Sequence, residues 1–186
     1  MNRALLLLAI LLAWTLPSAE AQDQKASSKL FAREKGDLIQ VAIQVRVEPG
    51  WHLYHGPNDT DIGTEGAVGK PTAVVFNAPG FEIGALVYPQ PRKVPQTIGD
   101  DKYTAYEHVG TFALLASGKK TKPDAKLADL SATISGLTCQ DSGVCIPYDE
   151  ELSNSGSGPD ALFPAAALAP APVAEKKKVS SKLFAR

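Results

Sequence analysis

From residue 39 to residue 48, large apolar residues alternate with polar residues and one alanine, Ala42. The apolar positions are Ile39, Val41, Ile43, Val45 and Val47. Because successive side chains of a β-strand point to opposite faces, this pattern predicts a strand with one face buried in a core. Pro49 and Gly50 follow directly and are typical of a turn, so the strand is expected to end there.

Further short β-rich runs follow, separated by clusters of Gly, Pro, Asn and Asp. They cover residues 51–54, 72–76, 81–88, 111–116 and 130–137. Beyond the first residues of the chain, no segment keeps the 3.6-residue apolar period of a surface helix. Together these runs predict an all-β sandwich or barrel of about seven or more strands. The proline-rich stretch 89–95 fits only an edge strand or an extended connection, because proline donates no ladder hydrogen bond.

The first 21 residues predict an export signal. A positive start at Arg3 precedes an apolar run from Ala4 to Trp14, which is too short to span a bilayer comfortably. Ala19 and Ala21 then form a small-x-small cleavage site. We expect cleavage after Ala21 and a periplasmic or secreted protein. The alternative is an uncleaved anchor, which the polar stretch that follows disfavours.

The remainder of the chain has the size of one domain followed by a tail. From about Ser153 the composition changes: residues 153–159 predict a flexible Ser/Gly linker, and residues 165–173 are an Ala/Pro tract. We therefore expect a β-sandwich domain at residues 22–155. A linker or tail rich in Pro, Ala and Lys is expected at residues 156–186.

Charge and hydropathy exclude two classes of partner. The formal net charge is −1, and no basic patch precedes the C-terminal tail, so nucleic acid is not an expected partner. No second apolar run reaches the roughly 18 residues that a membrane-spanning helix needs. The sequence therefore predicts a domain without a membrane span of its own.

A nine-residue segment occurs twice. Residues 25–33 and 178–186 agree at eight of nine positions. We expect the first copy to form the first strand of the sandwich, with Leu30 and Ala32 on one face and Phe31 on the other. The second copy resembles the start of another domain. We expect it to be a disordered end; the alternatives are displacement of the first strand in its own chain and strand exchange with a neighbour through residues 179–186.

The two cysteines, Cys139 and Cys145, are separated by five residues with turn chemistry at Asp141 and Gly143. Two strands joined by that turn would place the sulfur atoms opposite each other, with Cα atoms about 4.5–5.5 Å apart. As a structural staple, so short a loop would contribute roughly 2–2.5 kcal/mol. The spacing alone leaves a staple and a redox-active disulfide equally open. Exposure on a turn is what an exchanging disulfide needs.

Residues 138–147 resemble the active-site hairpin of the N-terminal periplasmic domain of the DsbD family of thiol–disulfide interchange proteins. That hairpin has Cys-x5-Cys followed by an apolar or aromatic residue and proline, which are Ile146 and Pro147 here. Residues 48–54 are similar to the family's early turn and aromatic strand, and residues 100–106 lie where the family has a cap loop. The resemblance runs from about Lys25 to Leu152.

The resemblance implies an immunoglobulin-like β-sandwich that carries an inserted active-site hairpin. It implies that Cys139 and Cys145 form a reversible disulfide and that Cys145 forms the mixed disulfide with partners. It also implies a cap over the pair. We assign the cap to Tyr103 with Asp101 beside it, although this loop departs from the family's aromatic-Tyr-Gly pattern. Two further aromatic residues, Trp51 and Tyr54, are candidate walls of the site, as well as core and edge residues.

The implied activity is thiol–disulfide exchange within a larger electron relay, and it needs no cofactor. The implied partners are thioredoxin-like domains and a membrane-embedded DsbD-type reductant, in cytochrome c maturation or disulfide isomerisation. DsbD proteins also carry a membrane domain and a thioredoxin-like domain. We therefore expect either that another protein supplies the electrons here or that the chain is a fragment or a degenerate copy. The alternative function is a non-catalytic immunoglobulin-like binding module in which the hairpin disulfide is structural.

Two weak metal motifs do not change this interpretation. His52 and His55 would point to opposite faces of a strand, so joint ligation would require a bend. Residues 59–70 are faintly similar to a calcium loop, but Lys70 stands where a bidentate glutamate is required. We therefore expect no metal site.

Overall fold

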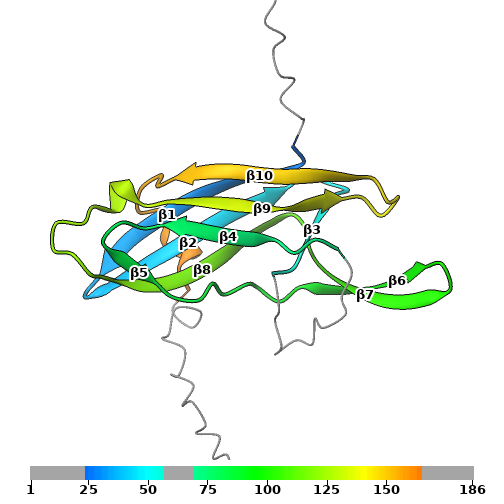
Figure 1. Cartoon of the computed structure of the whole chain (residues 1–186), viewed down its shortest axis with the longest axis horizontal. Coiled ribbons are helices and arrows are strands. Elements are labelled where there is room, and N and C mark those ends of the chain that lie inside the picture. The colour runs from blue at the N-terminus through cyan, green and yellow to red at the C-terminus, as the bar shows by residue number, and fades with distance from the viewer. Residues whose placement is uncertain (1–23, 57–68, 165–186) are drawn as a thin grey trace, which may run out of the picture.

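A computed structural model describes residues 24–56 and 69–164 and shows two antiparallel sheets packed face to face (Figure 1). The predicted export signal and the second copy of the repeated segment lie outside the described residues, as does most of the stretch similar to a calcium loop. Among the described residues, no helix is long and apolar enough to cross a membrane.

The first sheet has four strands in the order β1-β2-β8-β5. Their bounds are Ala26–Lys35 for β1, Leu38–Val47 for β2, Thr111–Lys120 for β8 and Phe81–Ile83 for β5. β1 and β2 form a hairpin in which Leu30 pairs with Ile43. The turn between them uses Gly36 at a positive φ of 61°, which glycine adopts without a steric penalty.

The second sheet has six strands, five of them in the order β10-β9-β3-β7-β6. Their bounds are Cys145–Ser153 for β10, Ser131–Cys139 for β9, His52–Tyr54 for β3, Asp101–His108 for β7 and Arg92–Ile98 for β6. The sixth strand, β4 (Ala73–Asn77), pairs with the first half of β9, while β3 pairs with its end. Two short 3₁₀ turns, η2 (Leu127–Asp129) and η3 (Asp160–Leu162), complete the structure.

The core between the sheets confirms the alternating pattern predicted for the second strand. The five apolar positions from Ile39 to Val47 are all buried in it, together with Leu30 and Ala32 of β1. Phe31 lies on the opposite face of β1, as predicted. Every second residue along the strand thus faces the core, which gives the strand one buried face.

The proline-rich stretch also occupies the place that its chemistry requires. β6 contains Pro95 and is the edge strand of the second sheet, where it pairs with β7 alone. Because proline has no backbone N–H to donate, it is tolerated at an edge, where no further strand needs that hydrogen bond. β6 and β7 form a hairpin that projects beyond the sandwich at the same end as the tip of the β9–β10 hairpin (Figure 1).

The interpretation of residues 153–159 as a flexible linker is wrong. Asn154 pairs with Leu30, and backbone hydrogen bonds join residues 155 and 156 to the free edge of β1. Beyond them Phe163 is buried against Ala42 and Leu115, on the face of the first sheet that points away from the core. The packed part of the chain therefore continues to Phe163.

Candidate functional site

The two cysteines lie at the end of the β9–β10 hairpin and are joined by a disulfide, with an S–S distance of 2.05 Å and a Cα–Cα distance of 4.1 Å. They are Cα partners in the antiparallel ladder, as predicted. The connecting turn closes with a hydrogen bond from the Gly143 amide to the Gln140 carbonyl. Gly143 has a φ of 89°, a left-handed conformation that favours glycine at this point of a hairpin loop.

The two sulfur-bearing residues differ in their contact with solvent. Cys139 is only 1% exposed, because β3 covers its other side, whereas Cys145 on the edge strand is exposed. The neighbouring Val144 is 52% exposed. The hairpin therefore presents one sulfur to an incoming reactant and keeps the other inside.

The disulfide belongs to a continuous set of side chains on one face of the second sheet. Cys139 is the Cα partner of both Cys145 and His52, and directly opposed residues point to the same face. Tyr54 lies two residues after His52 and therefore shares this face, and its own partner is Glu107. The intervening Leu53 points into the core. This outer face, defined by Cys145, Cys139, His52, Tyr54 and Glu107, is the candidate site.

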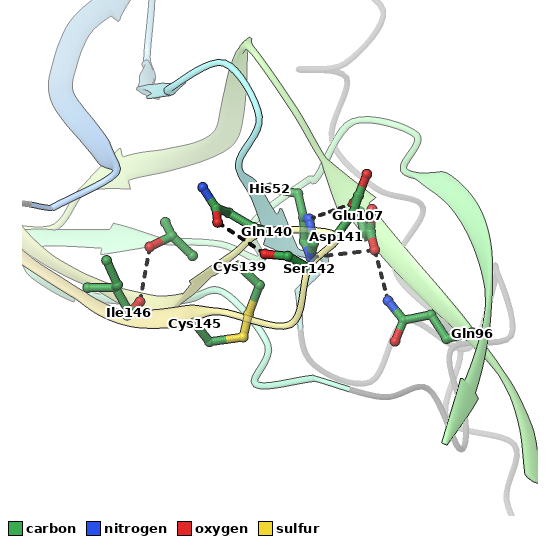
Figure 2. The surroundings of a disulfide bond; sticks show 10 residues. His52, Gln96, Glu107, Cys139, Gln140, Asp141, Ser142, Cys145 and Ile146 are labelled. Carbon is green, nitrogen blue, oxygen red and sulfur yellow. Dashed lines mark hydrogen bonds and ion pairs between the residues drawn. A yellow bond between two sulfur atoms is a disulfide. The ribbon is translucent and has the colours of Figure 1, made fainter. Parts of the chain in front are cut away.

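His52 lies between two carboxylates (Figure 2). Its Nε2 atom is 3.5 Å from Oε1 of Glu107, and its Nδ1 atom is 3.7 Å from Oδ1 of Asp141 in the hairpin turn. The side chains of His52 and Glu107 are buried, whereas that of Asp141 is 83% exposed. Nε2 of His52 is buried without a hydrogen-bond partner in the described structure. The imidazole thus has one nitrogen directed to the interior and one to the cysteine hairpin.

The buried carboxylate of Glu107 is held by two residues of β6. Arg92 donates from Nε and Nη2 to Oε2 of Glu107, at 3.0 and 2.8 Å. Gln96 donates to Oε1 at 3.3 Å. The Arg92 guanidinium also lies 3.7 Å from Asp141. A buried charge needs such pairing, so β6 is what allows a glutamate to occupy the inside of this face.

The surroundings of His52 have opposing effects on its pKa. The pKa of His52 is lowered from its ordinary value, chiefly by burial; the carboxylates of Glu107 and Asp141 oppose this lowering, and Arg92 adds to it. Burial also raises the pKa of Tyr54, which stands edge-on to the His52 ring at 5.2 Å. A pocket of about 240 Å³ opens beside the imidazole, lined by Trp51, Arg92 and Asp141 among others.

The structure brings two of the predicted site residues to this face or to the pocket beside it. Trp51 is buried in the core cluster and lines the pocket, and Tyr54 contacts His52. Asp101 and Tyr103 lie on β7 in the projecting β6–β7 hairpin, and the Tyr103 hydroxyl reaches a carboxylate oxygen of Asp101 at 3.4 Å. The assignment of these two residues to a cap remains a prediction.

Sequence reasoning missed Glu107, Arg92 and Asp141 as parts of the site, and considered His52 only as a metal ligand. The one signal in the sequence was the position of His52 in the aromatic strand. Glu107 lies near His52 because β3 pairs with β7, and no local sequence pattern predicts that pairing.

The cluster also has to be considered as a cation site. Ligand atoms of His52, Glu107 and Asp141 lie within 4.8 Å of one another. However, the guanidinium of Arg92 already binds Glu107 and approaches Asp141, so the positive charge at this place is supplied by the protein. We assign no metal ligands here.

The other two histidines lie on the opposite side of the same sheet. Nδ1 of His55 is 2.8 Å from Nε2 of His108, and both residues are buried. The His108 ring stacks on Phe112, and the His55 ring contacts Tyr88. As the sequence indicated, His52 and His55 do not converge on one point; each joins a separate cluster.

Comparisons with known proteins identify a family for this chain. The family described as "Thiol:disulfide interchange protein DsbD, N-terminal" matches residues 18–156. The solved N-terminal periplasmic domain of ScsB from Proteus mirabilis is 16% identical, with a TM-score of 0.47, over 72% of this chain and 47% of that one. The reduced N-terminal domain of Neisseria meningitidis DsbD is 16% identical, with a TM-score of 0.44, over 72% of this chain and 87% of that one. No curated protein sequence matches.

Proposed function

The chain belongs to the family of DsbD N-terminal domains and has their immunoglobulin-like fold, and from this premise we propose that it passes electrons through reversible reduction of the Cys139–Cys145 disulfide in an exported compartment. The observation that carries the proposal is the unequal exposure of the two cysteines at a hairpin tip. A disulfide that serves only as a staple has no need of an exposed sulfur, whereas thiol exchange requires access to one.

The unequal exposure supports a division of roles between the two cysteines. An incoming thiolate attacks the sulfur of Cys145, forms a mixed disulfide with it and releases Cys139, which later resolves the complex in the reverse direction. The exposed Val144 beside Cys145, and Val109 at the rim of the pocket, offer apolar surface to a docking protein. Thioredoxin-like domains and a membrane-embedded reductant are the proposed partners, in cytochrome c maturation or disulfide isomerisation.

The β6–β7 hairpin is the proposed cap. It projects at the same end of the molecule as the cysteine hairpin and carries Tyr103 and Asp101 (Figure 1). If it shields the disulfide, Tyr103→Ala should accelerate reduction by a small thiol several-fold while leaving the free energy of unfolding nearly unchanged. Tyr88→Ala, which removes a tyrosine from the other face, is a control for the loss of a ring. An unchanged rate would remove Tyr103 from the cap.

A trapping experiment tests the main proposal. Cys139→Ser leaves Cys145 as the attacking thiol and should accumulate a covalent complex with an oxidised thioredoxin-like domain. Cys145→Ser is the matched control and should trap little. Trapping by the control alone would reverse the roles of the two cysteines.

Mild reduction separates exchange from the staple function. The purified protein should gain two thiols with a small dithiol and keep its far-UV circular dichroism spectrum. A protein that resists reduction until denatured, or unfolds when reduced, would instead be a binding module with a structural disulfide.

A further inference from the structure

Reduction of the disulfide releases a thiolate at Cys139, which has to be protonated. When a thiolate attacks the exposed sulfur of Cys145, the leaving group is the thiolate of Cys139, a residue that is 1% exposed. Desolvation disfavours a buried thiolate, so the leaving sulfur needs a proton from inside the protein. The same sulfur has to lose that proton when Cys139 resolves a mixed disulfide.

We infer that His52 exchanges this proton with Cys139 and that Glu107 and Asp141 hold the imidazole in position for the transfer. This inference rests on the proposed function and assigns a proton carrier to it. Cys139 and His52 are directly opposed in neighbouring strands and share one face of the sheet, which places their Cβ atoms about 4.5–5.5 Å apart. The Nδ1 atom of His52 faces the cysteine hairpin.

The other ionisable groups of the outer face are less suited to the task. Glu107 is engaged by Arg92 and Gln96, and Asp141 extends largely into water. Burial raises the pKa of Tyr54 above its ordinary value of 10, which makes it a poor donor near neutrality. Histidine is the side chain that ordinarily changes charge between about pH 5 and 8.

The surroundings of His52 suit both of its protonation states. Facing it are Glu107 from β7, Asp141 from the hairpin turn, Arg92 from β6 and Tyr54 from its own strand. The carboxylates stabilise the imidazolium, while burial and Arg92 favour the neutral ring. The pocket beside the imidazole connects it to water, from which the proton is restored.

Reduction of the disulfide by a dithiol partner proceeds in two exchange steps. A partner thiolate forms an S–S bond to Cys145 as the Cys145–Cys139 bond breaks, and the Cys139 sulfur receives a proton from the His52 imidazolium. The partner's second thiolate attacks its own sulfur in the mixed disulfide and releases Cys145, which is protonated by water. Two electrons pass from the partner to the pair. The two protons that the partner's thiols release to water balance those taken up at Cys139 and Cys145, and the neutral His52 recovers its proton through the pocket.

The test measures the rate of reduction by a monothiol, divided by the thiolate concentration, against pH. His52→Gln should be slower than the wild type by about tenfold or more near pH 5.5, and the two should converge near pH 9, where histidine is neutral. His55→Gln, which removes a buried histidine from the opposite side, should follow the wild-type profile. A constant ratio of wild type to His52→Gln across this range would overturn the inference.

Imidazole titration by NMR needs no variant and covers the case in which His52→Gln does not fold. The chain has three histidines, so their signals can be assigned. The pKa of His52 should differ between the oxidised protein and the reduced protein, while that of His108 stays the same. Equal values for His52 in both states would contradict the proton transfer. If the wild type fails to exchange with any dithiol, the proposed function fails instead, a result distinct from these two.

Discussion

Two histidines of this protein are almost equally buried but have opposite surroundings. His52 is 2% exposed and His108 is 5% exposed, and they face opposite sides of the same sheet. His108 contacts His55 and the ring of Phe112, and burial, aided by His55, lowers its pKa to about 4. His52 lies between two carboxylates that oppose the effect of burial. Burial thus lowers the pKa of both histidines, but the neighbouring carboxylates limit the lowering at His52, whereas His55 adds to it at His108.

The largest effect expected from this difference is a loss of stability in acid through His108. Its pKa of about 4 in the folded protein lies below the ordinary value of 6.5, so the unfolded chain binds the proton first. The contribution is complete above about pH 6.5 and is lost as the pH falls towards 4, by up to about 3 kcal/mol. In urea denaturation, His108→Gln should flatten the pH dependence in this window. A slope equal to that of the wild type would refute the assignment.

A smaller loss is expected when the buried carboxylate beside His52 is neutralised. Glu107→Gln keeps the shape of the side chain but weakens the hydrogen bonds from Arg92, and should cost about 2 kcal/mol of unfolding free energy. It should also lower the pKa of His52. Glu82→Gln is the matched control, because its ion pair with Lys119 is largely exposed and should contribute less than about 1 kcal/mol. Equal losses in the two variants would show that Glu107 has no special role.

The smallest change in stability is expected from Arg92→Gln. The arginine side chain is 46% exposed and partly screened by water, but its partner Glu107 is buried and loses charge-assisted hydrogen bonds, so the substitution should cost about 1.5 kcal/mol. The informative measurement is the imidazole titration, because Arg92 lowers the pKa of His52 and its removal should raise that pKa. A lower pKa in this variant would mean that Arg92 positions the carboxylates more than it opposes the imidazolium.

Local patterns predicted much of this structure. The alternation from Ile39 to Val47, the edge position of Pro95 and the cysteine hairpin each depend on neighbouring residues, and all three were confirmed. The site around the disulfide depends instead on pairing between strands distant in sequence. Nothing local shows that β3 brings His52 beside Cys139, or that Glu107 enters the same face from β7.

The error at residues 153–159 has a similar origin. Serine, glycine and asparagine indicate flexibility by composition, but Asn154 accepts a hydrogen bond from the Ala32 amide and donates one to the Leu127 carbonyl. The polar face predicted for β2 includes Ala42, which is buried in the structure. A small apolar residue on a polar face was the one sign that another segment covers it.

The burial of Phe163 has a practical consequence for anyone who isolates this domain. Arg33 stacks on the Phe163 ring at 4.1 Å and also pairs with Asp160, so the end of the packed region is fixed to β1 by two kinds of contact. The family match ends at residue 156, before Asp160 and Phe163. An expression fragment cut at that boundary would leave Ala42 and Leu115 uncovered on the sheet surface and invite aggregation, whereas one that ends after Phe163 retains its own cover.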